Sequence, residues 1–320
     1  MSHIRTFILA AAAVALLGGE AAAQRQVNAR QDAAPTGTVE IAIGNGSLRV
    51  VGWGRNEVQV TGTLSRDGDR VVLDGSGRTT EVRVQGRGRG GGATLEVRVP
   101  AGSSIEVVTG TAPITVTGVT GAVETVSQGG TTTIQGRPRT IEATTAHGGI
   151  TVDATPDRVA LTSMAGPVRV AGTVRQRAEI SAMAGSVEVT GSVGEAEIHA
   201  LNGAIRVANV TGGRVEINSV SGSVNVAGTR LRGNVQSVSG AVTVSGTLGG
   251  ALNVESHAGS VEVRLPASTG AEVQVTTWNG GVDSAWRLAR DGREWRGTLG
   301  RGGPNLSITT FSGSVKLIRR

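Results

Sequence analysis

Seven glutamates recur at one position of a repeated sequence unit and form the most regular set of ionisable side chains in the chain. Each lies between the two residues of an apolar pair, so on a strand all seven point outward. They are Glu40, Glu106, Glu124, Glu142, Glu179, Glu197 and Glu216. Stacked carboxylates could collect divalent cations through oxygen ligands. However, the Gly-Asp nonapeptide of calcium-binding β-rolls is absent. Arginine precedes the ladder position by two residues in four copies, at Arg158, Arg177, Arg214 and Arg232. We therefore interpret the ladder as a solvated face whose repulsion is offset by arginines, and we predict no metal site.

Three histidines, His147, His199 and His257, could serve a zinc site or a catalytic triad only if they lay close together. They occupy three different positions of the repeat, and neighbouring histidines are separated by three repeats, about 14 Å at strand spacing. The position of His257 is apolar in other copies, so we expect a structural role for it; those copies hold Met164, Met183, Leu201, Val220, Trp278 and Phe311. The sequence predicts no catalytic, cofactor-binding or metal-binding residue, and no cofactor.

Two loops imitate functional motifs. The segment QGRGRGGG at 85–92 resembles an arginine-glycine nucleic-acid segment, and Asp67, Gly68 and Asp69 resemble a metal loop. We interpret both as ordinary turns and loops, and we expect no nucleic-acid partner.

An enzyme acting on polysaccharides is a less favoured interpretation. Such enzymes on β-helices need clustered acids or bases over a groove, and sugar binders use exposed aromatic platforms. Residues 104–265 contain no Trp, Tyr or Phe. We therefore predict that the chain is not an enzyme.

The backbone pattern is far more informative. A pair of apolar residues two apart is followed nine positions later by a second such pair, and this unit occurs twelve times. Clean copies read AEISAMAGSVEV at 178–189, AEIHALNGAIRV at 196–207 and VEINSVSGSVNV at 215–226. Between Ile114 and Val261 the unit recurs with a period of about 18–19 positions. The alternation within each pair predicts inward-facing side chains on short strands, and the nine-position offset predicts two strands per coil.

A coil this short cannot bury its own apolar face, so successive coils must stack about 4.8 Å apart. We predict an all-β fold: a β-solenoid, similar to a β-helix, with coils of about 18–19 residues and two short strands per coil, capped by irregular β regions at both ends. Glycine lies two positions before the second pair begins in eleven of the twelve copies, including Gly203 and Gly222. Either a positive backbone dihedral or close packing of stacked turns requires it.

Residues 1–23 have the pattern of a signal peptide, with Arg5, a short apolar core and small residues at Ala21 and Ala23 before Gln24. The apolar stretch is too short for a membrane span, and we expect no transmembrane segment after cleavage. The rest divides into a flexible linker at 24–37, an N-terminal β region and cap at 38–103, the regular solenoid at 104–265, and C-terminal coils at 266–320 with a hairpin inserted at about 284–305. Four tryptophans in the end regions are expected to cap the stack; they are Trp53, Trp278, Trp286 and Trp295.

The chain has no cysteine, which excludes disulfides, thiolate metal sites and a bacterial lipid anchor. Its net charge is +6, enough to favour anionic envelope polymers weakly.

Four segments in combination resemble a bacterial exported family called toastrack, a β-strand-repeat domain whose adhesin label is itself an inference. They are RVPAGSSIEV at 98–107, the recurring SVSGSVNV-like unit, LPASTGAEVQVTTWNGGV at 265–282 and LSITTFSGSVKL at 306–317. The resemblance implies a β-solenoid in the cell envelope and supplies no catalytic or ligand residues.

The sequence therefore favours an exported, non-enzymatic interaction or scaffold module of the envelope or cell surface, periplasmic or extracellular. Its partner is unknown; an anionic polysaccharide and a membrane protein are the candidates. The alternative is a component of envelope-stress sensing or signalling that acts through a membrane partner.

Overall fold

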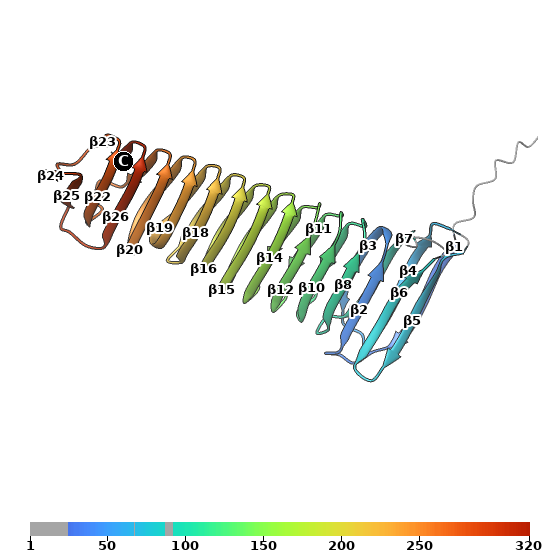
Figure 1. The fold of residues 1–320 in the computed structure, drawn as a ribbon. Helices are drawn as coiled ribbons and strands as arrows, with labels where there is room; N and C mark the ends of the chain where they lie inside the picture. The colour runs from blue at the N-terminus through green and yellow to red at the C-terminus, as the bar shows by residue number, and fades with distance from the viewer. Residues whose placement is uncertain (1–24, 67, 87–91) are drawn as a thin grey trace, which may run out of the picture.

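A computed structural model describes residues 25–66, 68–86 and 92–320 as an elongated rod of strands stacked side by side (Figure 1). The signal peptide predicted at 1–23, Asp67 of the candidate metal loop and residues 87–91 of the arginine-glycine segment lie outside the described residues. No helix long and apolar enough to cross a membrane occurs in the described part of the chain.

Each coil contributes one strand to each of two parallel sheets. The sheet that carries the glutamate position, which we call the ladder sheet, contains β2 (Thr38–Ile43), β6 (Thr79–Gln85), β8 (Ser104–Thr109), β10 (Ala122–Ser127), β12 (Thr140–Thr145), β14 (Arg158–Ala165), β18 (Arg214–Ser221), β22 (Ala271–Asn279) and β26 (Asn305–Ser312). The second sheet contains β3 (Asn45–Trp53), β7 (Gly92–Pro100), β9 (Ile114–Thr117), β11 (Thr132–Gly136), β13 (Ile150–Ala154), β17 (Ile205–Thr211), β21 (Val261–Leu265), β23 (Val282–Ser284) and β27 (Val315–Arg319). Four long strands begin in the second sheet and end in the ladder sheet: β15 (Val168–Ala184), β16 (Val187–Asn202), β19 (Val224–Ser239) and β20 (Val242–Ala258).

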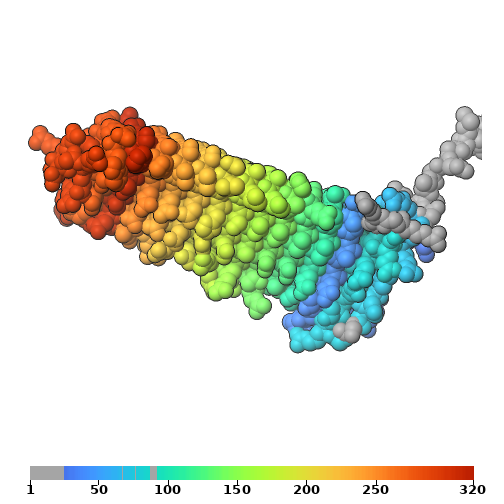
Figure 2. Space-filling view, viewed as in Figure 1, coloured from blue at the N-terminus to red at the C-terminus, as the bar shows by residue number. Residues whose placement is uncertain are grey.

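The register of the parallel pairs confirms the predicted solenoid. Val123 lies beside Ile141, which lies beside Val159, so equivalent residues of successive coils form straight ladders. The inward ladders of both sheets are Val, Ile, Leu and Ala side chains that are almost fully buried. Each buried Val or Ile contributes about 1.5–3 kcal/mol, and this single continuous core holds the rod together. In the space-filling view the coils follow one another as bands along the body (Figure 2).

The turn between the two strands of a coil explains the glycine column. At Gly203 the backbone has φ of 148°, and an added Cβ would lie 2.1 Å from the carbonyl oxygen of Gly185 in the coil before. Gly222 is held in the same way, with φ of 130° and 2.2 Å to the Gly203 oxygen. Both reasons anticipated for the column therefore act together here, because the turns stack backbone against backbone.

The coil order departs from the chain order at both ends. At the N-terminal end β2 lies between β6 and β8, and β3 lies between β7 and β9. At the C-terminal end β26 lies between β20 and β22, and β27 between β21 and β23. The first and last coils in sequence are therefore the second and second-to-last in space. The coil formed by β6 and β7 is a thirteenth that the repeat pattern misses, because its second pair begins at Leu95, fifteen positions after the equivalent of Val39 at Thr80 and not nine.

Antiparallel strands close both ends. β5 (Arg70–Ser76) pairs with β6, β4 (Glu57–Leu64) pairs with β7, and β25 (Glu294–Leu299) pairs with β22. The segment 24–37, expected to be a flexible linker, instead contains β1 (Arg25–Asp32), paired antiparallel with β4. Its composition is too polar to indicate a strand, and the open edge of β4 supplies the pairing. Within 284–305 the structure has a hairpin of β24 (Ala289–Asp291) and β25.

Candidate interaction surface

One line of exposed apolar side chains runs along the outer face of the ladder sheet. It occupies one position of eight consecutive coils, and we call it the apolar stripe. In spatial order it consists of Met164, Met183, Leu201, Val220, Val238, His257, Phe311 and Trp278. The seven hydrophobic members are each 43–53% exposed. Contiguous apolar patches of this kind are rare on monomers and often mark interaction sites.

The stripe ends in an aromatic stack. The rings of His257 and Phe311 lie 5.0 Å apart and almost parallel, at 3°, and Trp278 lies 6.3 Å beyond Phe311. Because the rings face one another along the rod, they present edges rather than faces to the outside. They therefore form an apolar ridge and not the flat aromatic platform on which sugar rings stack. The expectation that all four tryptophans cap the ends is wrong for Trp278, which is exposed on the sheet face, whereas Trp286 and Trp295 pack against the core at the end.

A polar column runs beside the stripe, two residues closer to the start of each strand. Its members are Thr162, Ser181, His199, Asn218, Gln236, Glu255, Thr309 and Thr276. Except for Thr276, the residues of the stripe and the column together line a shallow groove of about 670 Å³. The groove thus offers apolar contact along one side and hydrogen-bonding groups along the other.

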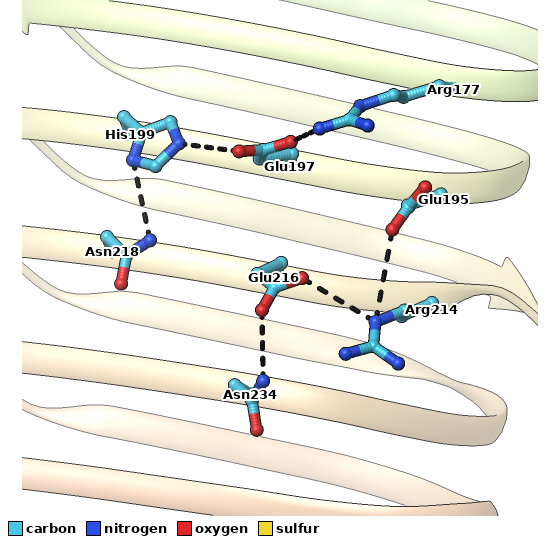
Figure 3. Close-up of polar contacts among 8 residues, drawn as sticks. All are labelled: Arg177, Glu195, Glu197, His199, Arg214, Glu216, Asn218 and Asn234. Atoms are coloured by element: carbon cyan, nitrogen blue, oxygen red, sulfur yellow. Dashed lines mark hydrogen bonds and ion pairs between the residues drawn. The ribbon is translucent and has the colours of Figure 1, made fainter.

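Ion pairs and hydrogen bonds fix the polar side chains next to the groove (Figure 3). Glu197 pairs with Arg177 from the preceding coil and accepts a hydrogen bond from His199 Nε2 at 3.0 Å. The Asn218 amide donates to His199 Nδ1 at 3.4 Å. With Nδ1 accepting, the imidazole carries its proton on Nε2. His199 is therefore held by its neighbours, as a structural histidine would be.

The glutamate ladder has two different halves. Towards the C-terminal end arginines pair with it: Arg177 from the preceding coil pairs with Glu197, and Arg214 pairs with Glu216 of its own strand. The predicted offset by arginine is present there. Glu40, Glu106, Glu124 and Glu142 form an uninterrupted row on β2, β8, β10 and β12. None of these four has an ion-pair partner among the described residues.

Glu106, in the middle of this row, shows the effect of the crowding. Partial burial, followed by the charges of Glu124 and Glu40, raises the pKa of Glu106 above the ordinary glutamate value. In contrast, hydrogen bonding from Asn234 and the nearby Arg214 lower the pKa of Glu216. The two glutamates therefore influence stability in opposite directions.

We predict that Glu106→Gln raises the melting temperature at pH 7 by about 1 °C, because like charges on adjacent strands repel weakly in solvent. Because the pKa of Glu106 is raised in the folded state, protonation of Glu106 favours folding below the unfolded-state pKa of about 4.3. This contribution is lost as the pH rises through the folded-state pKa. The gain should therefore disappear when the pH is lowered below 4. Glu216→Gln, the control, should lower the melting temperature at pH 7 instead. Thermal melts from pH 3 to 8 measure both, and a loss of stability in Glu106→Gln at pH 7 would contradict the assignment.

The structure does not bring the three histidines together, since neighbouring histidines remain three coils apart. His147 lies in the turn after β12, His199 on β16 and His257 on β20. Across the described ranges, no group of three or more His, Asp or Glu side chains is placed to hold a metal ion. Reasoning from sequence misses the stripe, although it does place His257 at a position that other copies fill with apolar residues. The signal available is that this position faces outward by strand alternation and is nevertheless apolar in coil after coil.

The family model described as Toastrack DUF4097 matches residues 35–318. The chain belongs to the toastrack family. No curated protein matches the toastrack chain significantly. Solved structures similar to it include a "putative adhesin" from Parabacteroides merdae, 8% identical, covering 92% of this chain and 96% of that one with a TM-score of 0.38. A "putative lipid binding protein" from Parabacteroides distasonis is 12% identical, with 92% and 96% covered and a TM-score of 0.34. A "putative adhesin" from Bacteroides fragilis is 12% identical, with 92% and 97% covered and a TM-score of 0.29.

Proposed function

We propose that this toastrack protein is an exported, non-enzymatic interaction module of the cell envelope or cell surface, and that the apolar stripe is its binding face. The observation that carries the proposal is the line of seven hydrophobic side chains left about half exposed on a rigid sheet. Burying them against another macromolecule would release ordered water along the groove, which is the main favourable term in association.

The surroundings of the stripe support binding rather than catalysis. The polar column alongside it consists mostly of Ser, Thr, Asn and Gln, which form hydrogen bonds with a partner but do not by themselves activate a substrate. The signal-peptide pattern of residues 1–23 supports export.

The test follows the exported chain in cells. The full chain with a C-terminal epitope is expressed, cells are fractionated into cytoplasm, periplasm, outer membrane and medium, and the intact mass of the exported form is measured. We expect a mature protein that begins at Gln24. Native electrophoresis of the exported fraction should show it in a complex larger than one chain.

The matched variants in this test are Val220→Asn with Val238→Asn in the stripe, and Val108→Asn with Val126→Asn outside it. All four valines are 41–57% exposed on the ladder sheet, so the two pairs cost similar strand propensity. The stripe pair should dissolve the complex and the outer pair should leave it intact. Retention of the chain in the cytoplasm, or equal complexes for both pairs, would contradict the proposal.

A further inference from the structure

We propose that the partner on the apolar stripe is a second copy of this chain, laid face to face with its rod antiparallel. The inference rests on the proposed function, in that it takes the stripe as a binding face, and it adds the identity and direction of the partner. In such a dimer the two-fold axis lies between the ladder sheets of the two protomers and runs along the strand direction. It crosses the stripe midway, between Val220 and Val238. The first coil of one stripe then faces the eighth of the other.

The order of residues along the stripe is complementary under this operation. Met164 of one protomer faces Trp278 of its partner, and Met183 faces Phe311. Methionine sulfur makes favourable contacts with aromatic rings, often at the ring edge, and the stacked rings present their edges outward. The small side chains Val220 and Val238 meet at the centre. The thioethers all lie in one half of the stripe and the aromatic rings in the other, as a self-complementary antiparallel face requires.

The polar column is complementary in the same register. His199 in the third coil faces Glu255 in the sixth, and Asn218 faces Gln236. The first pair joins a histidine to a carboxylate: His199 Nε2 would exchange its bond to Glu197, which Arg177 also pairs, for one to the partner's Glu255. The second pair joins two amides, each of which still has a free donor and acceptor group within the described part of the chain. A parallel arrangement has its two-fold axis along the rod, which would turn each polar column to the opposite flank of the partner's stripe and leave both pairs unformed. The polar column therefore favours the antiparallel direction.

Charges beyond the ends of the stripe agree with the same direction. Residues 266–320 contain eight basic and four acidic side chains, and four of the arginines lie in or beside the β24–β25 hairpin. Arg296 on β25 lies beside Gln274 on β22. Gln274 occupies the glutamate-ladder position of its coil, so Arg296 lies in line with the glutamate ladder. β25 is the strand after the eighth coil of the stripe, and β12 is the strand before the first. The antiparallel register therefore sets Arg296 against Glu142 of the partner subunit, and β24 against Glu124.

This contact supplies a partner for a feature that the single chain leaves unexplained. Glu124 and Glu142 belong to the row of carboxylates that form no ion pair in the described part of their own chain, although Arg158 and Arg177 line the same hollow. Arg296 pairs with Glu294 of its own strand, and in the dimer it would lie between two carboxylates. The hairpin arginines of a second copy would thus provide the missing opposite charge at each end of the dimer. The stripe spans seven coil spacings, about 34 Å, and with the flanking columns this length suits an interface of standard size, about 800 Å² per partner.

Sedimentation of purified residues 24–320 tests the partner. We expect a monomer–dimer equilibrium at micromolar concentration. Val220→Asn with Val238→Asn should weaken the dimer at least about a hundred-fold, because four buried valines are lost per dimer. The outer pair, Val108→Asn with Val126→Asn, lies at or beyond the margin of the contact, since only Val126 is on a strand that faces the partner, and it should weaken the dimer less than about five-fold. Thermal melts of both pairs should agree within about 2 °C of each other, which separates binding from folding.

Cross-linking tests the direction, and the absence of native cysteine makes it free of background. Met183→Cys and Phe311→Cys are prepared separately and treated with a short bismaleimide, alone and as an equilibrated mixture. Facing sheets are about 10 Å apart, whereas identical residues in the antiparallel dimer are five coil spacings, about 24 Å, apart. We expect covalent dimers in the mixture and almost none in either variant alone. Covalent dimers of each variant with itself would establish the parallel arrangement and overturn the proposal.

Two further results would also overturn it. One is a purified chain that stays monomeric at about a hundred times the micromolar concentration at which we expect the dimer. The other is a monomer whose native mass spectrum shows a bound acyl lipid. If the purified chain is monomeric while the exported fraction still shows a stripe-dependent complex, the proposed function stands and the stripe has a different partner.

Discussion

Replacing Gly203 or Gly222 with valine is expected to remove at least about 3 kcal/mol of folding free energy. Two penalties add at each position. Valine is strained at the positive φ of both glycines, and its Cβ would lie 2.1–2.2 Å from a carbonyl oxygen of the preceding coil. Because that oxygen is a backbone atom, it cannot move away by a change of side-chain rotamer. Chemical denaturation of the purified variants measures the loss.

Gly129→Val is the matched control, because it lies in an equivalent turn but has no positive φ. Its nearest neighbour would be the Thr111 methyl group at an ordinary 3.4 Å. We expect a loss below about 1 kcal/mol there. Since coils contact only their neighbours, hydrogen exchange in the Gly203 variant should rise in the adjacent coils as well. A Gly203 variant as stable as Gly129→Val would show that the register of the turns is wrong.

Deleting residues 305–320 is expected to abolish a soluble, folded rod. This segment forms β26 and β27, which pair on both sides with β20, β22, β21 and β23. The deletion removes four fully buried inward side chains, together about 6–12 kcal/mol of apolar burial, and they are Leu306, Ile308, Val315 and Leu317. It also exposes strand edges on both sides of the gap, which promotes aggregation. Soluble yield and size-exclusion profile measure the outcome.

Deletion of an interior coil is the matched comparison. Removing residues 122–139 takes out one whole coil and joins Gly121 to Thr140, which occupies the place of Ala122 in the register. The flanking coils can then stack directly, so we expect a soluble rod with a single melting transition. If the interior deletion aggregates and the terminal one stays folded, the end coils do not close the stack as described.

The solenoid itself could be predicted from sequence because its period is short and its inward pairs are repeated in every coil. Glycine at the turn and Val or Ile in the pairs specify two strands and a tight connection without reference to distant residues. The order of the coils at the ends could not be predicted. Inserting β2 between β6 and β8 depends on contacts between segments that lie far apart in the chain, and no local pattern encodes such a choice.

The candidate site was predicted only in part. The Glu ladder and its pairing with Arg177 and Arg214 follow from the alternation along the strands, and the structure places them as expected. To predict that one half of the ladder has no ion-pair partner, one must know that Arg158 and the later arginines lie on strands after β12. The repeat already assigns Phe311 and Trp278 to the position of Met164, but the sequence does not show that the reordered coils set Phe311 between His257 and Trp278. The sequence therefore predicts most members of the column but not their order in space or that they form one exposed face.

The position of β27 has a mechanical consequence. β27 is hydrogen-bonded along both edges, to β21 and to β23. A force applied at Arg319 and directed along the strand must break two ladders at once and slide the strand in shear. A force applied at Arg25 acts on β1, which the structure pairs with β4 alone, and opens one ladder bond by bond. The rod should therefore resist tension much better through its C-terminal strand than through its N-terminal one.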